Sequence, residues 1–355
     1  MIRFLLTFGA ILALPSVSSA NPVQKEMCHI YQKYYGLTER KHVDWEKDCF
    51  NKKGDLMRDV FGPLMTDTLK DGHSSISYRD KTVSYEPDIH PYLEQMLQTV
   101  TPRYIDYTVD IEDNAYLAYG ELKSDSSIGY INTFNFEPET DLEDDYDYFA
   151  ELVDNALDSL KTKRAIIIDA RLNQGGQVPM AFYLAGRFYQ GEAIQVARYR
   201  IRTPNGKLSH WLDGEVIGYQ DHRADGGYVS GVFAEDGYLR KSGEYQYQKP
   251  VILLTSKLTA SAAEFFTIAM KNQKHVTVIG TSTFGIFSGS DILTLSSDAN
   301  YSTRLSTQDI EVYIDDQFTS LEGIGIKPDI SDEISGSHVE KGFDSQLEKA
   351  ISSLQ

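Results

Sequence analysis

Cysteine, positive charge and long apolar runs are all scarce in this sequence. Its 355 residues include two cysteines, and 34 lysines and arginines stand against 52 aspartates and glutamates, a formal charge of −18. A surface of that charge repels phosphate backbones, so we expect no nucleic-acid partner. After the first twenty residues no apolar stretch is long enough to cross a bilayer, so we expect no stable membrane insertion.

The first twenty residues, "MIRFLLTFGAILALPSVSSA", predict a signal peptide spanning 1–20. Arg3 supplies the positive end, "FLLTFGAILAL" the apolar stretch, and Ser18 and Ala20 the small residues before a cleavage point. The alternative is a membrane anchor, for which the apolar run is short. We therefore expect an exported protein, either periplasmic or secreted.

The two cysteines, Cys28 and Cys49, both lie in the N-terminal segment. In an oxidising compartment they predict a disulfide between two short helices. Without clustered histidines they make a poor zinc site. The acidic stretch 137–148 lacks the glycine and closing glutamate of a calcium loop, and acids at the start of a helix explain it better. We expect neither a metal nor an organic cofactor.

Changes of pattern along the chain predict its organisation. Apolar residues at three- and four-residue spacing make 21–80 an N-terminal helical subdomain, and 81–128 reads as a small β-containing connection. We expect an α/β domain over 129–335 and a C-terminal helix over 336–355. The interlude 193–248 is rich in Tyr and Gly and predicts an insertion of short strands, placed where a lid over a site would lie.

The fold class is predicted by buried strands that alternate with helices. "RAIIIDAR", "KPVILLTS" and "HVTVIGTS" are apolar runs of strand length, and amphipathic segments separate them. This alternation predicts an α/β fold with a mostly parallel sheet. Turns at 169–176, 259–264 and 280–285 follow the three strands, at the edge where α/β proteins place their sites.

The turn "TASAAE" raises a question about Ser261. Glu264 follows three residues later, which is the spacing of a capping box at a helix start. The same serine at a helix N-terminus is also a candidate nucleophile, which then needs a base. Of the eight histidines, His73 in "DGHSS" differs because it lies between a helical pattern and a strand, beside Gly72. The pattern alone leaves both interpretations of Ser261 open.

Six segments in one order resemble the tail-specific, or C-terminal-processing, serine peptidases and the related tricorn protease core. They are "DGHS", "GYINTFNF", "IIIDARLNQGG", "LTSKLTASAAEFFTIAMKN", "VIGTSTFG" and "EGIGIKPDI". The resemblance covers most of 60–335, and "TASAAE" and "EGIGIKPD" are its most specific parts. It implies a catalytic domain similar to the crotonase and Clp-protease α/β core.

The resemblance also implies residue roles. Ser261 matches the family's nucleophile, and the backbone N–H groups of Ala262 and of Gly175 or Gly176 match its oxyanion hole. The tail-specific branch has a lysine base where this sequence has Ile286, which cannot accept a proton. The tricorn-like branch has a histidine and a glutamate instead, which match His73 and Glu322.

Two further differences from the family are visible. The serine that precedes the tricorn histidine is replaced by Gly72, so Ser74, Ser75, a water or direct contact must join His73 to Glu322. The segment 80–128 is too short for a PDZ domain.

The resemblance implies an exported serine endopeptidase acting on peptides or proteins through an acyl-enzyme. The alternative is a non-catalytic ligand- or peptide-binding protein on the same scaffold. An esterase lacks support because no GxSxG elbow occurs. The sequence does not determine an oligomeric state.

Overall fold

The computed structural model describes residues 21–110, 115–139, 142–203, 205–212, 220–222, 228–230 and 237–355. The predicted signal peptide therefore lies outside the described residues, as does much of the middle of the 193–248 insertion. Within the described residues, no helix combines the length and the apolar character needed to cross a membrane.

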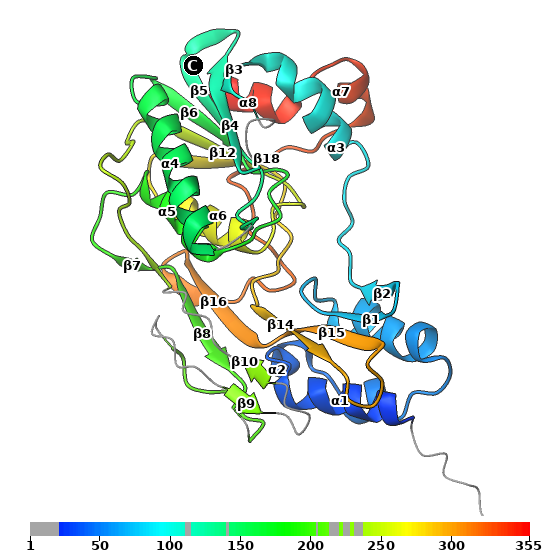
Figure 1. Ribbon diagram of the computed structural model, residues 1–355. Coiled ribbons are helices and arrows are strands. Elements are labelled where there is room, and N and C mark those ends of the chain that lie inside the picture. The colour runs from blue at the N-terminus through cyan, green and yellow to red at the C-terminus, as the bar shows by residue number, and fades with distance from the viewer. Residues whose placement is uncertain are drawn as a thin grey trace, which may run out of the picture.

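A seven-stranded sheet forms the centre of the molecule (Figure 1), in the order β18-β13-β12-β6-β5-β4-β3. Its strands are β3 (Ile105–Val109), β4 (Leu117–Leu122), β5 (Asp125–Thr133), β6 (Ala165–Asp169), β12 (Val251–Thr255), β13 (Val276–Gly280) and β18 (Ile330–Ser331). The pairs from β18 to β5 are parallel, and β5, β4 and β3 pair antiparallel. Every residue of β6 and β12 is buried, as their continuous apolar runs predict. The predicted α/β class is confirmed.

Helices bury both faces of this sheet. The first face carries α4 (Leu142–Leu160), α5 (Val178–Gly186) and α6 (Ala262–Lys271), which Figure 1 shows side by side. The cluster on that face includes Ile166 and Ile168 of β6. The intervening Ile167 faces the other way, toward α8 (Ser345–Ser353). This alternation follows from the two-residue period of a strand.

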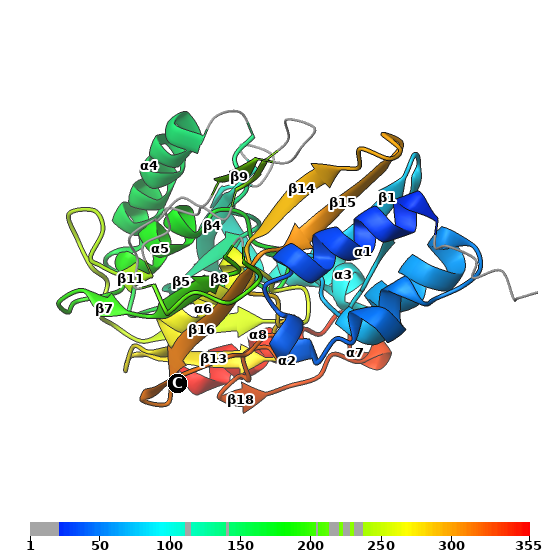
Figure 2. The same ribbon diagram turned by 90° about the horizontal axis from the view of Figure 1, so that it is seen from below.

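The N-terminal segment packs on a second sheet, of order β14-β15-β1-β2. Its strands are β1 (Ser75–Tyr78), β2 (Lys81–Ser84), β14 (Ser290–Thr294) and β15 (Tyr301–Ser306). In Figure 2 α1 (Pro22–Tyr34) runs beside β15 and β1. Apolar residues of the N-terminal helices and of β14 and β15 share one buried cluster. Two segments more than 200 residues apart in the chain therefore fold as one unit.

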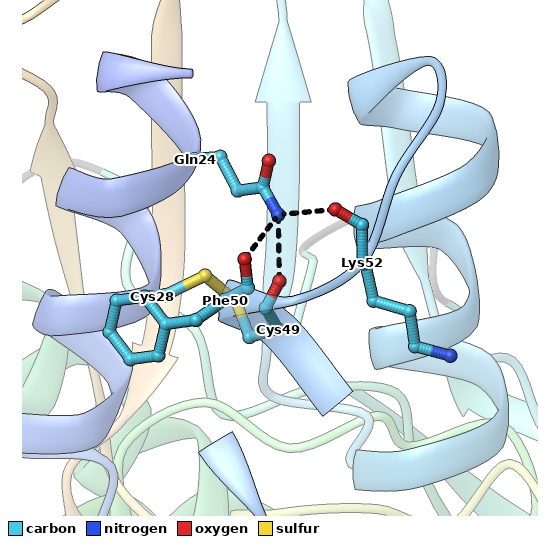
Figure 3. Close-up of a disulfide and its surroundings, with 5 residues drawn as sticks. All are labelled: Gln24, Cys28, Cys49, Phe50 and Lys52. Atoms are coloured by element: carbon cyan, nitrogen blue, oxygen red, sulfur yellow. Dashed lines mark hydrogen bonds between the residues drawn. A yellow bond between two sulfur atoms is a disulfide. The ribbon is translucent and has the colours of Figure 1, made fainter. Parts of the chain in front are cut away.

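The predicted disulfide joins Cys28 of α1 to Cys49 of η1 (Glu46–Phe50), as Figure 3 shows. Both cysteines are fully buried. The side-chain N–H₂ of Gln24 donates to the carbonyls of Cys49 and Lys52 at 2.7 and 3.0 Å, so polar contacts tie the same two elements together.

Short elements complete the fold. The helical ones are α2 (Thr38–Lys41), η2 (Leu56–Phe61), η3 (Leu64–Leu69), α3 (Leu93–Gln95), η4 (Met96–Val100), η5 (Thr101–Tyr104) and α7 (Gly336–Glu340). The strands are β7 (Ile194–Gln195), β8 (Ala197–Ile201), β9 (Gln220–His222), β10 (Tyr228–Ser230), β11 (Tyr238–Leu239), β16 (Gln308–Ile314) and β17 (Gln317–Thr319). Strands β17, β16 and β8 form a three-stranded antiparallel sheet, and β9 pairs with β10 and β7 with β11.

Candidate active site

Ser261 lies in the sharp turn that leads from the buried strand β12 into α6. Its backbone has φ 55° and ψ −124°, a conformation that residues other than glycine rarely adopt. Such strain, of order 1–3 kcal/mol, persists where the surrounding structure enforces it and is frequent at functional sites. This conformation is compatible with the predicted role of Ser261 as a nucleophile, although the chain has no GxSxG sequence.

Glu264 fixes this turn from inside. Its carboxylate is fully buried and accepts the N–H of Ser261 at 3.2 Å, so the glutamate half of the predicted capping box is present. It also accepts the hydroxyl of Thr283 at 2.5 Å and the N–H groups of Gly285 and Ile286 at 2.8 Å each. Burial raises the pKa of Glu264 to about 7, although these hydrogen bonds act to lower it. The residue thus joins the helix start to the turn after β13.

The double-glycine turn packs directly on Ser261. Gly175 and Gly176 have φ values of 103° and 128°, which favour glycine. A Cβ on Gly175 would lie 2.7 Å from the Cβ of Ser261 and 2.8 Å from the nitrogen of Ala262. The N–H of Gly175 donates to the side-chain oxygen of Asn173 at 2.9 Å. Among the described residues no hydrogen bond engages the N–H of Gly176 or Ala262.

His73 lies in the loop between η3 and β1. Its backbone N–H donates to Asp71 Oδ1 at 2.9 Å, which folds residues 71–74 into a tight turn. A Cβ at Gly72 would lie 2.6 Å from the ring of Phe284, so a larger residue there would displace that side chain. Ring atom Nδ1 is buried without a hydrogen-bond partner in the described part of the chain. Burial lowers the pKa of His73, while the Asp71 charge and a hydrogen bond to the backbone of Ser288 raise it.

One cavity of about 870 Å³ brings Ser261, His73 and both glycines together. The segment between β2 and α3, which crosses from the second sheet to the first in Figure 1, forms part of its wall. That wall includes a second histidine, His90, whose ring Nδ1 accepts the N–H of Tyr92 at 3.4 Å. Two further histidines lie in the 193–248 insertion. His210 is exposed, and the side chain of His222 is outside the described residues.

Glu322 contacts the turn at 287–288, which lines the cavity of Ser261. It lines a separate cavity of about 280 Å³, and its Oε2 accepts the N–H groups of Phe287 and Ser288 at 2.8 and 3.3 Å. The other oxygen is buried without a partner among the described residues. Burial and the nearby Asp71 raise the pKa of Glu322 to about 8. Glu322 and His73 thus both contact the backbone of Ser288.

Ser74 and Ser75, the two serines considered as a link between His73 and Glu322, make other contacts in the described part of the chain. The hydroxyl of Ser74 donates to Asp71 Oδ2 at 2.6 Å and accepts the N–H of Ser306 at 3.1 Å. Ser75 is the first residue of β1 and lies opposite Arg304 of β15 and Ser84 of β2. The carboxylate next to His73 is that of Asp71.

The position of the missing lysine is filled by an apolar side chain. Ile286 lines the cavity of Ser261 and is 6% exposed. The lysine nearest to Ser261 in the sequence is Lys257, and burial lowers the pKa of its amine. That amine donates to the carbonyls of Thr283 and Phe284 at 2.8 and 3.2 Å and lines other cavities than that of Ser261. Lys257 therefore ties its own turn to the turn at 283–284.

Two residues of the site were missed from the sequence. The side chain of Asn173 accepts the N–H of Gly175 and donates to Thr133 at 3.1 Å. Its backbone carbonyl accepts the N–H of Ala260 at 3.1 Å, so the residue joins the glycine turn to the turn of Ser261. Asp71 holds the histidine loop. Each is an Asn or Asp two residues before the group that it binds, the local signature of an Asx turn.

Comparison with known proteins identifies the family of this chain. Residues 127–332, more than half of the chain, match the model of peptidase family S41, and the chain belongs to that family. It is similar to the carboxy-terminal-processing protease of Bartonella bacilliformis, at 26% identity over 63% of this chain and 43% of the relative. A second relative is the chloroplastic carboxyl-terminal-processing peptidase 2 of Arabidopsis thaliana, at 24% identity over 59% and 33%. The chain thus spans less than half the length of these curated relatives.

A solved structure supports the fold over nearly the whole chain. It is that of a candidate peptidase from Parabacteroides merdae, with a TM-score of 0.66 and 22% identity, and the match covers 93% of this chain and 95% of that one. Family and fold together confirm the resemblance to the tail-specific, C-terminal-processing peptidases.

Proposed function

We propose that this chain is an exported serine endopeptidase that cleaves peptide bonds through an acyl-enzyme. The observation that carries the proposal is the strained Ser261 at the start of α6, in one cavity with His73 and the double-glycine turn. In this proposal Ser261 attacks the peptide carbonyl, and His73 takes its proton and later returns it to the leaving amine. The N–H groups of Ala262 and Gly176 hold the oxyanion, because that of Gly175 is engaged by Asn173.

Glu322 has an indirect part in this proposal. By accepting the N–H groups of Phe287 and Ser288 it fixes the turn whose backbone hydrogen-bonds to His73. This makes the site a variant of the tricorn-like arrangement, with a backbone segment in place of a serine relay.

A fluorophosphonate probe tests the nucleophile. We expect the probe to label wild-type protein at Ser261 and to leave Ser261→Ala unlabelled. A folded wild-type protein that resists labelling would instead favour the alternative, a peptide- or ligand-binding protein. The observation that supports that alternative is the apolar Ile286 in the same cavity, where the tail-specific branch has a lysine.

The assignment of the base is tested with the histidines of the chain. His73→Ala should lower kcat by about 10²–10⁴-fold with folding intact, because an unassisted serine hydroxyl is a weak nucleophile. His90→Ala is the critical comparison since His90 lines the same cavity, and His210→Ala reports on an exposed histidine. A loss of that size in His90→Ala but not in His73→Ala would assign the base to His90.

A further inference from the structure

Arg171 is a fully buried arginine in the turn that leads from β6 to the two glycines of the site. Its Nε donates to Asp169 Oδ1 at 2.9 Å, and its Nη2 donates to Asp169 Oδ2 at 2.6 Å. Nη1 and Nη2 donate to the two carboxylate oxygens of Asp344 at 2.9 Å each, and Nη1 also donates to Gln346 Oε1 at 3.0 Å. Every nitrogen of the guanidinium therefore has a partner. The reaction proposed above does not use this arginine.

The C-terminal segment supplies two of the three partners. Asp344 is the N-cap of α8, and its Oδ2 also accepts the hydroxyl of Thr101 at 2.6 Å. Gln346 donates to the backbone carbonyl of Asp332 at 2.7 Å. Both partners are fully buried. The start of α8 is thus fixed against Arg171, on the face of the central sheet opposite to α6.

The backbone beside Arg171 contacts the turn that leads to Ser261. The carbonyl of Arg171 accepts the hydroxyl of Ser256 at 2.5 Å, and the carbonyl of Ala170 accepts the hydroxyl of Thr259 at 2.8 Å. Arg171 therefore joins two parts of the molecule. Its side chain binds the start of α8, and its backbone binds the turn after β12.

Side-chain contacts determine the path of this turn. Residues 170–177 form neither a helix nor a strand of their own, apart from the isolated bridge between Gly176 and Phe136. A guanidinium that binds two carboxylates in pairs of parallel bonds fixes direction as well as distance. Because an unpaired charge in the interior is very unfavourable, the buried arginine stays with these partners. The beginning of the turn is held firmly as a result.

We propose that Arg171 is a positioning residue: anchored to the C-terminal segment at 344–346, it holds the turn that presents the N–H of Gly176 to the oxyanion. This inference rests on the proposed function, in which an oxyanion forms at that N–H. Arg171 does not line the cavity of Ser261 and acts through the backbone of its turn. The start of α8 then belongs to the support of the site, although it lies across the sheet from the nucleophile.

Hydrogen–deuterium exchange followed by mass spectrometry tests the proposal without requiring activity. Arg171→Lys keeps the charge but loses the paired bonds to both carboxylates. We expect the amides of 170–177 to exchange about tenfold faster in this variant, because the turn opens more often. Arg187→Lys is the matched control: Arg187 is also buried and pairs with Asp154 at 2.8 Å, but it follows the far end of α5 from the glycine turn. It should leave exchange in 170–177 at the wild-type rate.

A milder variant keeps the test decisive if Arg171→Lys fails to fold. Gln346→Met removes one hydrogen bond from Arg171 and leaves both carboxylates in place, so exchange in 170–177 should rise by a smaller factor. Exchange at the wild-type rate in whichever of these two variants folds would overturn the proposal. So would an equal rise in Arg187→Lys.

Kinetics provide a separate readout in the active protein. Arg171→Lys should lower kcat by about 10²-fold, the loss that a displaced oxyanion donor causes, with KM nearly unchanged. Affinity for a peptide boronic acid should fall as well, because its adduct with Ser261 places an oxygen where the oxyanion forms. Arg187→Lys should keep both values.

The two proposals fail in different ways. A wild-type protein that neither hydrolyses peptides nor reacts with the fluorophosphonate would contradict the proposed function, while exchange would still show whether Arg171 orders the turn. An active protein in which Arg171→Lys speeds exchange but leaves kcat unchanged would contradict the role of Arg171 alone.

Discussion

At the scale of single residues, the site depends on how closely two turns approach each other. Ser261 adopts a backbone conformation that is unfavourable for serine. Gly175 packs directly against it, and only a residue without a side chain fits there. Asn173 fixes the distance between them by binding both turns. The approach leaves no room for a methyl group, so the site should be very sensitive to side-chain volume at this point.

Gly175→Ala should therefore reduce activity strongly. The added Cβ would lie 2.7 Å from both the Ser261 Cβ and the Ala260 carbonyl oxygen, so the turn of Ser261 and Ala262 must move away from the Gly176 donor. We expect kcat to fall by about 10²-fold or more, the loss that a displaced oxyanion donor causes. Gly206→Ala is the control: Gly206 also has a positive φ, 76°, but its Cβ would meet nothing within 4 Å. That variant should lose about 1 kcal/mol of stability through strain and keep its kcat.

At the scale of elements, the N-terminal helices position His73 by packing on strands from the far end of the chain. Tyr31 of α1 shows the connection, because its hydroxyl lies 2.8 Å from that of Thr303 in β15. Strand β15 pairs in turn with β1, which begins two residues after His73. The disulfide of α1 lies in the same buried cluster, so the covalent link supports the platform of the histidine loop.

Removing this disulfide should lower stability more than activity. The bridge closes a segment with a sequence separation of 21, for which loop entropy predicts about 3 kcal/mol. Cys28→Ala, Cys49→Ala and the double variant should each show that loss in denaturant unfolding followed by circular dichroism. Since either single change already breaks the bridge, the double variant should cost about as much as one of them. Losses that add in the double variant would mean that side-chain packing, and not the link, stabilises this region.

The sequence predicted elements better than their partners. The apolar runs of β6 and β12 identified buried strands, and the spacing from Ser261 to Glu264 identified the start of α6, because these signals are local. The pairing of β1 with β15 was not predicted, since register between distant strands leaves no short-range pattern. The surroundings of Glu322 were not predicted for the same reason: a motif names a residue but does not show which cavity it lines. The catalytic role of Glu322 stays a prediction. The domain boundaries drawn from the sequence stay a prediction.

At the scale of the whole molecule, most of the excess negative charge lies in solvent, but a few carboxyl groups are enclosed. Burial raises the pKa of Asp291 to about 6, of Glu264 to about 7 and of Glu322 to about 8. An exposed carboxyl group ionises near pH 4, so these three bind protons in the folded protein that the unfolded chain has already lost. Folding is therefore linked to pH in the neutral range by groups around the site itself.

This linkage predicts that the protein loses stability as the pH rises from 7 to 9. Over that range the folded protein gives up the protons of Glu264 and Glu322, whereas the unfolded chain binds none there, so the folded state loses its advantage. His73 and His275 have lowered pKa values and titrate below this window. We expect the melting temperature to fall across the range, with Glu322 contributing on the order of 1 kcal/mol. Glu322→Gln, which cannot ionise, should flatten the dependence, and a slope as steep as that of the wild type would show that Glu322 is already ionised at pH 7.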